Sequence, residues 1–197
     1  MPKGRKVNSS GEKSKKLLLE KAMELFSTNG YHETKISDIV KSANLTQPTF
    51  YLYFQSKESL YKDLIEQFQT NFFAIVHNDL ENNSSANSSF IHKIEEGLVN
   101  IFNYFADNSF LTKIGFYESD EAHVIKEKFS LILTDKLKAD KDIDFSSEIE
   151  AKLFADTIVG AIERLTLTAL FTKLRKPEQL ATDIVNIYFM NQKALAR

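Results

Sequence analysis

A dense run of side chains suited to molecular recognition lies between residues 46 and 57. The amide of Gln47 can donate and accept hydrogen bonds together, which matches the major-groove edge of adenine. The hydroxyls of Thr49 and Tyr51 suit phosphate oxygens, which position a protein on a duplex without specifying its sequence. Pro48 and Leu52 offer the apolar contact that a thymine methyl group accepts. These residue types favour recognition of double-stranded DNA.

A short helix over residues 47–54 would present these side chains to a partner. At about 100° per residue, Phe50 and Phe54 share the inner face of such a helix. Pro48 and Leu52 then lie on the opposite face, where they are free to meet DNA. The pattern therefore predicts a recognition helix with a buried aromatic side and an outward reading side.

The residues around this helix are predicted to hold it in place. Asn44 is expected to adopt a left-handed backbone conformation in the preceding turn, since Asn tolerates it best after Gly. Thr46 is expected to cap the helix by accepting a hydrogen bond from the Thr49 N–H. Gln47 projects from the amino-terminal end, which enters the major groove in helix-turn-helix proteins. Lys57 opens the next helix, so its charge and the free N–H groups there are predicted to bind one phosphate.

Two further helices are predicted upstream, over residues 14–28 and 35–43. Asn29-Gly30 is typical of a helix end, because Gly adopts the left-handed conformation that closes the last turn. With the recognition helix, these elements predict a three-helix, helix-turn-helix DNA-binding domain over residues 14–62.

Charge is divided unevenly along the chain. Residues 1–62 carry a balance of +5, and residues 63–197 carry −7. A basic front and an acidic rear favour a polyanionic partner for the front. Residues 1–13 are polar and are expected to form a flexible basic arm, which either follows the DNA backbone or minor groove or remains an unbound tail.

Several classes of protein are disfavoured by composition and spacing. The chain has no Cys, which excludes disulfides, thiolate metal sites and Cys nucleophiles. It shows no spacing typical of a metal site, no Gly-rich phosphate loop and no His beside an evident nucleophile. We therefore expect no enzyme, no cofactor and no metal. No apolar run is long enough for a membrane span, and no signal-peptide core follows the basic start, so a cytoplasmic protein without membrane association is expected.

Residues 63–197 are predicted to form a second helical domain, which makes the whole chain all-α. Ser147 followed three residues later by Glu150 is a capping box for one of its helices. From residue 153 to residue 171 that helix is apolar on nearly every side, so both of its flanks must be covered. A second copy of the same helix is the simplest partner, which predicts a homodimer. A long helix capped by Ser56 and a helix carrying the apolar residues Ile91 to Phe105 are also expected. Further helices are expected at about residues 110–117, 121–137 and 177–194.

The region from Ala43 to Leu60, ANLTQPTFYLYFQSKESL, resembles the signature of the tetracycline-repressor (TetR/AcrR) family of transcription regulators. Upstream, residues 25–39 are similar to the first two helices of that family. The resemblance covers roughly residues 14–62. It implies DNA contact at the matching positions, which are Thr46, Gln47, Pro48, Thr49, Tyr51, Leu52, Tyr53 and Lys57.

Three positions depart from the family pattern. Asn44 replaces the usual Gly of the turn. Lys35 replaces a frequent second Thr, so the cap of the second helix is expected to fall to Thr34, with Lys35 free for a phosphate. Leu52 replaces a common His or aromatic residue, which removes a polar contact. Thr34 and Lys35 are therefore included among the expected DNA contacts.

In this family the carboxy-terminal helices form a small-molecule pocket, and the apolar residues of this half are compatible with one. Aromatic residues at helical spacing are more often simple core, and that interpretation stays open. The residues that we expect to converge on a pocket are Phe102, Phe105, Phe110, Ile114, Tyr117, Phe129, Ile158 and Ile162.

The resemblance implies a sequence-specific repressor that binds a palindromic operator as a homodimer and is released by a small apolar or amphipathic effector. The two recognition helices would then sit about 34 Å apart. The helix that opens at Lys57 is the expected lever between effector and DNA. The alternative is a DNA-binding protein that acts through a protein partner, without an effector.

Overall fold

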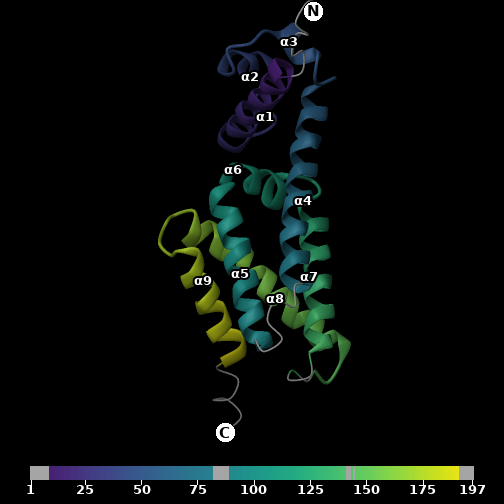
Figure 1. The fold of residues 1–197 in the computed structure, drawn as a ribbon, viewed down its shortest axis with the longest axis vertical. Helices are drawn as coiled ribbons and strands as arrows, with labels where there is room; N and C mark the ends of the chain where they lie inside the picture. The colour runs from purple at the N-terminus through teal and green to yellow at the C-terminus, as the bar shows by residue number, and fades with distance from the viewer. Residues whose placement is uncertain (1–8, 82–88, 141–142, 144, 191–197) are drawn as a thin grey trace, which may run out of the picture. The chain divides into compact units, whose positions relative to one another are not determined.

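The computed structural model describes residues 9–81, 89–140, 143 and 145–190, and every regular element among them is helical (Figure 1). The prediction of an all-α chain is confirmed. The helices group into two compact units. The described residues of the first unit are 9–68 and 110–119, and those of the second unit are 69–109 and 120–190.

The first unit holds the three predicted amino-terminal helices and two segments from later in the chain. Its core is aromatic, because Phe26, Phe50 and Phe68 are all fully buried. Gly30 ends the first helix with φ +87° and donates its N–H to the Phe26 carbonyl, as a terminal Gly does. The elements are α1 (Ser9–Asn29), α2 (Ile36–Ser42), α3 (Gln47–Tyr51), the first part of α4 (Lys57–Glu81), α6 (Ser109–Thr112) and the π-helical η1 (Lys113–Glu118).

Gly115 of η1 lies against Phe68 of α4 inside the first unit. A Cβ atom at position 115 would lie 2.3 Å from ring atoms of Phe68 and 2.7 Å from its Cβ. No other residue type fits there without movement of α4 or η1, because such contacts are shorter than any van der Waals separation. Gly115 therefore lets residues 110–119 close over the core of the first unit.

The second unit packs α5 against α9 and α7 against α8. Ser89 caps α5 and Ser147 caps α8, each by accepting a backbone N–H bond from the residue three positions later. The Glu150 carboxylate binds the N–H and hydroxyl of Ser146, so only half of the predicted capping box is confirmed. The elements are the rest of α4, α5 (Phe90–Asp107), α7 (Ala122–Ala139), α8 (Glu148–Leu165) with η2 (Thr166–Leu170), and α9 (Pro177–Val185) with η3 (Asn186–Met190).

The observed element bounds correct three predictions. Residues 9–13 form the first turns of α1, so the flexible arm predicted for residues 1–13 is wrong for that part, and residues 1–8 lie outside the described residues. Helix α3 ends at Tyr51 because the backbone tightens after it, with the Leu52 N–H donating to the Thr49 carbonyl. The contact units also differ from a simple division after residue 62, because residues 110–119 belong with the first unit.

Candidate nucleic-acid interface and interior cavity

A tight turn between α2 and α3 sets the direction of the recognition helix. Asn44 adopts φ 53°, so the left-handed conformation predicted for it is confirmed. The Leu45 N–H donates to the Val40 carbonyl at 2.8 Å, and the Ala43 N–H donates to the Ile39 carbonyl at 3.0 Å. These bonds satisfy the end of α2 and fix where α3 begins.

The start of α3 differs from the predicted cap. The Thr46 hydroxyl lies 2.9 Å from the Thr49 hydroxyl and makes no cap bond to a backbone N–H. The prediction that Thr46 caps the Thr49 N–H is wrong, because the two hydroxyls satisfy each other first. Thr46 still has the extended backbone of a capping residue, and its carbonyl accepts the Phe50 N–H at 3.1 Å.

Helix α3 has one buried and one exposed face, as predicted. Phe50 and Phe54 are buried, with ring centroids 5.4 Å apart. Tyr51 and Leu52 are 56% and 76% exposed, although both are large side chains that folding normally buries. Gln47 and Pro48 are exposed beside them, Thr49 is half-buried, and the half-buried Tyr53 has its hydroxyl beside Gly11. These exposed side chains are therefore accessible to a partner.

Lys57 does not point its charge at open solvent. Its Nζ donates to the carbonyls of Tyr31 at 2.7 Å, Thr34 at 2.9 Å and His32 at 3.5 Å. The same ammonium lies 4.2 Å from the centroid of the Tyr31 ring. An ammonium has three donors, and all three are engaged. The structure thus assigns Lys57 to holding the connection between α1 and α2, and the phosphate contact predicted for Lys57 stays a prediction.

Thr34 and Lys35 have different positions from those expected. The Thr34 side chain is buried, and its hydroxyl donates to the carbonyls of Gly30 at 2.8 Å and Leu25 at 3.3 Å. It does not cap α2, so the predicted cap is wrong, and the predicted DNA contact of Thr34 stays a prediction. Lys35 occupies the capping position instead and is exposed, with its N–H donating to the Asp38 carboxylate at 3.1 Å.

The lysines at the start of α1 are held by acidic neighbours. Lys15 pairs with Asp63 at 3.4 Å, and its ammonium lies 5.4 Å from the Phe54 ring centroid. Lys16 lies 3.8 Å from Glu20. These exposed pairs stabilise the unit weakly, and they place part of the amino-terminal positive charge on a helix.

The second unit contains an apolar cavity of about 40 Å³, partly open to solvent. Its lining comes from α4, α5, α7 and α8. Phe129, Ile158 and Ile162 were predicted to line a pocket, and the structure brings these three together. Sequence reasoning missed seven others, although three of them form the apolar stripe of α5. The missed residues are Val76, Lys93, Ile94, Gly97, Leu98, Ile101 and Leu133.

The other five predicted pocket residues do not line this cavity. Phe102 and Phe105 are fully buried core, and Phe105 stacks on Phe72 with ring centroids 5.6 Å apart. Phe110, Ile114 and Tyr117 belong to the first unit. Of the predicted aromatic residues, Phe129 lines this cavity, and the rest of the wall is aliphatic apart from Lys93 and Gly97. Ligand contact at the other predicted residues stays a prediction.

Comparison with known proteins agrees with the helix-turn-helix geometry. Residues 18–64 match the model of the bacterial regulatory proteins of the tetR family. An uncharacterised HTH-type transcriptional regulator of Bacillus subtilis (strain 168), YdgC, is 35% identical over 182 residues, which cover 92% of this chain and 93% of that protein. The chain belongs to the TetR family. It is a DNA-binding transcription regulator, from a family that is not enzymatic.

Solved TetR-family structures share the fold at low sequence identity. A TetR-like regulator from Rhodococcus sp. RHA1 has a TM-score of 0.75 and 17% identity, covering 98% of this chain and 99% of that one. FadR of Bacillus subtilis, solved in complex with stearoyl-CoA, has a TM-score of 0.67 and 20% identity, covering 88% and 96%. Within the described ranges, no helix is long and apolar enough to cross a membrane, and no group of acidic and His side chains is arranged to hold a metal ion.

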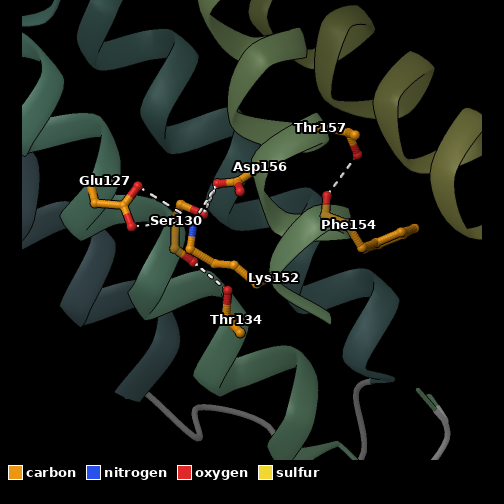
Figure 2. Close-up of polar contacts among 7 residues, drawn as sticks. All are labelled: Glu127, Ser130, Thr134, Lys152, Phe154, Asp156 and Thr157. Carbon is orange, nitrogen blue, oxygen red and sulfur yellow. Dashed lines mark hydrogen bonds and ion pairs between the residues drawn. The ribbon is translucent and has the colours of Figure 1, made fainter. Parts of the chain in front are cut away.

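A polar cluster joins α7 to α8 in this TetR-family chain (Figure 2). The buried Ser130 donates to Asp156 at 2.6 Å, and Lys152 reaches both Asp156 at 2.7 Å and Glu127 at 3.3 Å. Hydrogen bonds from Lys152 and then Ser130 lower the pKa of Asp156. The Thr134 hydroxyl donates to the Ser130 carbonyl on the same helix. The cluster fixes the register of two helices that both contribute to the cavity wall.

Proposed function

We propose that the protein is a homodimeric repressor that binds a palindromic operator and is released by a small apolar or amphipathic effector. The observation that carries the DNA-reading part is the outward face of α3. There the exposed Tyr51 and Leu52 lie beside the amide of Gln47 in a unit with a filled core. Such a face offers both hydrogen bonds and apolar contact to base edges. As a DNA-binding regulator of this family, the protein would act in the cytoplasm.

The proposed contacts divide into reading and positioning groups. Gln47 reads adenine, and Pro48 and Leu52 meet thymine methyl groups. The exposed Lys35 and the hydroxyl-bearing residues contact phosphates, which set register without reading sequence. The positioning residues are Lys35, Thr46, Thr49, Tyr51 and Tyr53.

Homodimer formation is supported by exposed apolar residues on α8 and on η3, the segment after α9. Ile149 and Leu153 of α8 are 72% and 59% exposed, and Ile187 is 61% exposed. Gly160 of α8 is exposed and would have no atom within 4 Å of an added Cβ, so a second helix can approach closely there. A two-fold pairing of this surface would bury it. Leu153→Asp should therefore convert a dimer to a monomer in light scattering, and an unchanged mass would contradict the pairing.

Effector control is supported by the position of the cavity along α4. Val76 of α4 contributes to the cavity wall, and Lys57 at the start of the same helix holds the turn before α2. A ligand that favours a different position of α4 lowers DNA affinity by its differential affinity for the two states. FadR of Bacillus subtilis, which shares the fold, was solved with stearoyl-CoA.

Selection from a random DNA pool at near-physiological salt tests the DNA-binding part of the proposal. We expect an enriched palindrome whose half-sites lie about one helical turn apart. Gln47→Ala should weaken binding to that site by about tenfold or more and relax preference at one base pair, because a bidentate contact is lost. Thr49→Ala should weaken all sequences alike. If the selection enriches no sequence, the DNA-binding part of the proposal is contradicted.

A second candidate function is a DNA-binding protein that acts through a protein partner. The small cavity favours it, since about 40 Å³ is well below the roughly 300–1,000 Å³ of most ligand pockets. Mass spectrometry of the denatured, purified protein distinguishes the two functions. A co-purified small molecule supports effector control, and its absence together with a captured protein partner supports the second function.

A further inference from the structure

Lys93 is the charged residue in an otherwise apolar cavity wall. Nine of the ten lining residues are aliphatic, aromatic or Gly, and Lys93 is half-buried among them. A lysine in such a place lays its methylene stem along apolar surface and carries its ammonium to the rim. The cavity therefore has an apolar interior with a positive charge at its edge.

The acidic residues that follow Lys93 on α5 are engaged elsewhere. Glu96 lies 3.3 Å from Nε2 of His92, and Glu95 accepts a hydrogen bond from the Thr182 hydroxyl at 2.6 Å. Within the described part of the chain, Lys93 forms no ion pair or side-chain hydrogen bond. An ammonium at the rim that has no carboxylate partner is open to an anion from solution, and a charge-assisted hydrogen bond to such an anion is a strong one.

We propose that the cavity binds an amphiphile with an apolar chain and an anionic head group, and that the Lys93 ammonium binds the head group. The inference rests on the proposed effector function and names the chemical class of that effector. The chain would lie between the aliphatic side chains of α5 and α8, such as Leu98 and Ile158. Gly97 stands one turn after Lys93 on the same wall and lacks a side chain, which leaves room beside the ammonium.

The present cavity volume requires the helices to separate when such a chain enters. About 40 Å³ is far below the roughly 300–1,000 Å³ of most ligand pockets. Separation of α5 from α7 or α8 is therefore part of binding. A ligand that enlarges the cavity displaces the helices that line it, and this displacement is what an effector must produce.

Direct titration of the full-length protein without DNA tests the head group. Dodecanoic acid, dodecanol and dodecylamine share one chain length and differ in charge, and each is used below its micelle concentration. We expect the acid to bind about tenfold or more tightly than the alcohol, since hydrogen bonds to charged groups are the stronger ones, and the amine to bind weakest. Dodecyl phosphate and dodecanoyl-CoA then show which anionic head group is preferred.

Substitution of Lys93 assigns the preference to this side chain. Lys93→Met keeps the length and removes the charge, so the acid should lose its advantage while the alcohol binds as before. Lys93→Arg should keep the advantage. Lys128→Met removes a lysine of α7 that stacks on Phe73 outside the cavity lining, and it should change neither affinity. Circular dichroism of each variant shows that the helices are intact.

Three outcomes overturn the inference. The first is equal binding of acid and alcohol to the unaltered protein, and the second is an acid preference that survives in Lys93→Met. The third is a failure of all the amphiphiles to bind. None of these outcomes affects the DNA selection, which tests the proposed function separately. Conversely, if the DNA selection enriched no operator, the titration without DNA would still report on ligand binding in the cavity.

Discussion

The two units of the molecule fill their interiors differently. The first unit is centred on the fully buried rings of Phe26, Phe50 and Phe68, and Gly115 lies against the last of these at a distance that no side chain tolerates. The second unit keeps a cavity between four helices. The difference teaches that the DNA-reading unit is built to hold one shape, whereas the other unit has room to change when it is filled.

Gly115→Ala should have the largest effect, because it tests how little room the first unit has. The added methyl group would collide with Phe68, and overpacking of this kind costs about 2–3 kcal/mol. Denaturant unfolding followed by circular dichroism, with hydrogen exchange of peptides from each unit, measures the loss and locates it. The double variant Gly115→Ala/Phe68→Leu should recover part of the stability. If Gly115→Ala were as stable as the original protein, the first unit would not be tightly packed at Phe68, and the contrast between the two units would be wrong.

Lys57→Met should follow, with a loss of about 2 kcal/mol in unfolding free energy. The variant leaves three backbone carbonyls without the ammonium that binds them, and hydrogen bonds to charged groups contribute about 1.5–3 kcal/mol. If Lys57 served only as a phosphate contact, stability would not change and only DNA affinity at low salt would fall. Thermal unfolding in the absence of DNA separates the two roles.

One substitution made in both units sharpens the comparison. Val40 of α2 and Val76 of α4 are both buried, but only Val76 lines the cavity. Val40→Ile should destabilise the protein by about 1 kcal/mol through overpacking. Val76→Ile should be neutral or stabilise by up to about 0.8 kcal/mol, because the extra methyl group enters free space. If denaturant unfolding shows the same loss of unfolding free energy for both variants, the cavity beside Val76 cannot accommodate a methyl group.

Asp156→Asn should have the smallest effect, below about 1 kcal/mol, because this cluster is partly exposed. The lowered pKa of Asp156 makes its contribution complete above the ordinary value of 3.8 and lost as pH falls through the lowered pKa. The melting temperatures of the variant and the original protein should therefore converge below about pH 4. Glu148→Gln removes the carboxylate of the exposed pair with Lys138 and is the matched control for loss of a surface charge on α8. A constant difference between pH 6 and pH 3 would show that Asp156 does not act through its charge.

Local signals in the sequence predicted the DNA-reading part well. The left-handed Asn44, the terminal Gly30 and the inner face of Phe50 and Phe54 depend on residues a few positions apart. The errors there concerned helix caps. Thr34 was expected to cap α2, and only the fold shows that the Thr34 hydroxyl is used by the end of α1 and the turn after it.

The cavity and the role of residues 110–119 were not predictable in the same way. The sequence shows Ile94, Leu98 and Ile101 as an apolar stripe. The cavity beside that stripe depends on how four helices that are distant in sequence pack together. Large aromatic residues were chosen as pocket lining, and their size is what fills the core. The close approach of Gly115 to Phe68 is likewise a contact across almost fifty residues, which no periodicity records.

The membership of residues 110–119 in the first unit has a consequence for synthesis of the chain. A nascent protein that has been made as far as residue 68 holds all three helices of the helix-turn-helix and still lacks a part of the same unit. At the usual elongation rate of about 5–20 residues per second, the missing segment follows roughly 3–10 seconds later. During that interval Phe68 has no Gly115 to lie against, so the first unit is completed only after more than half of the chain has been translated.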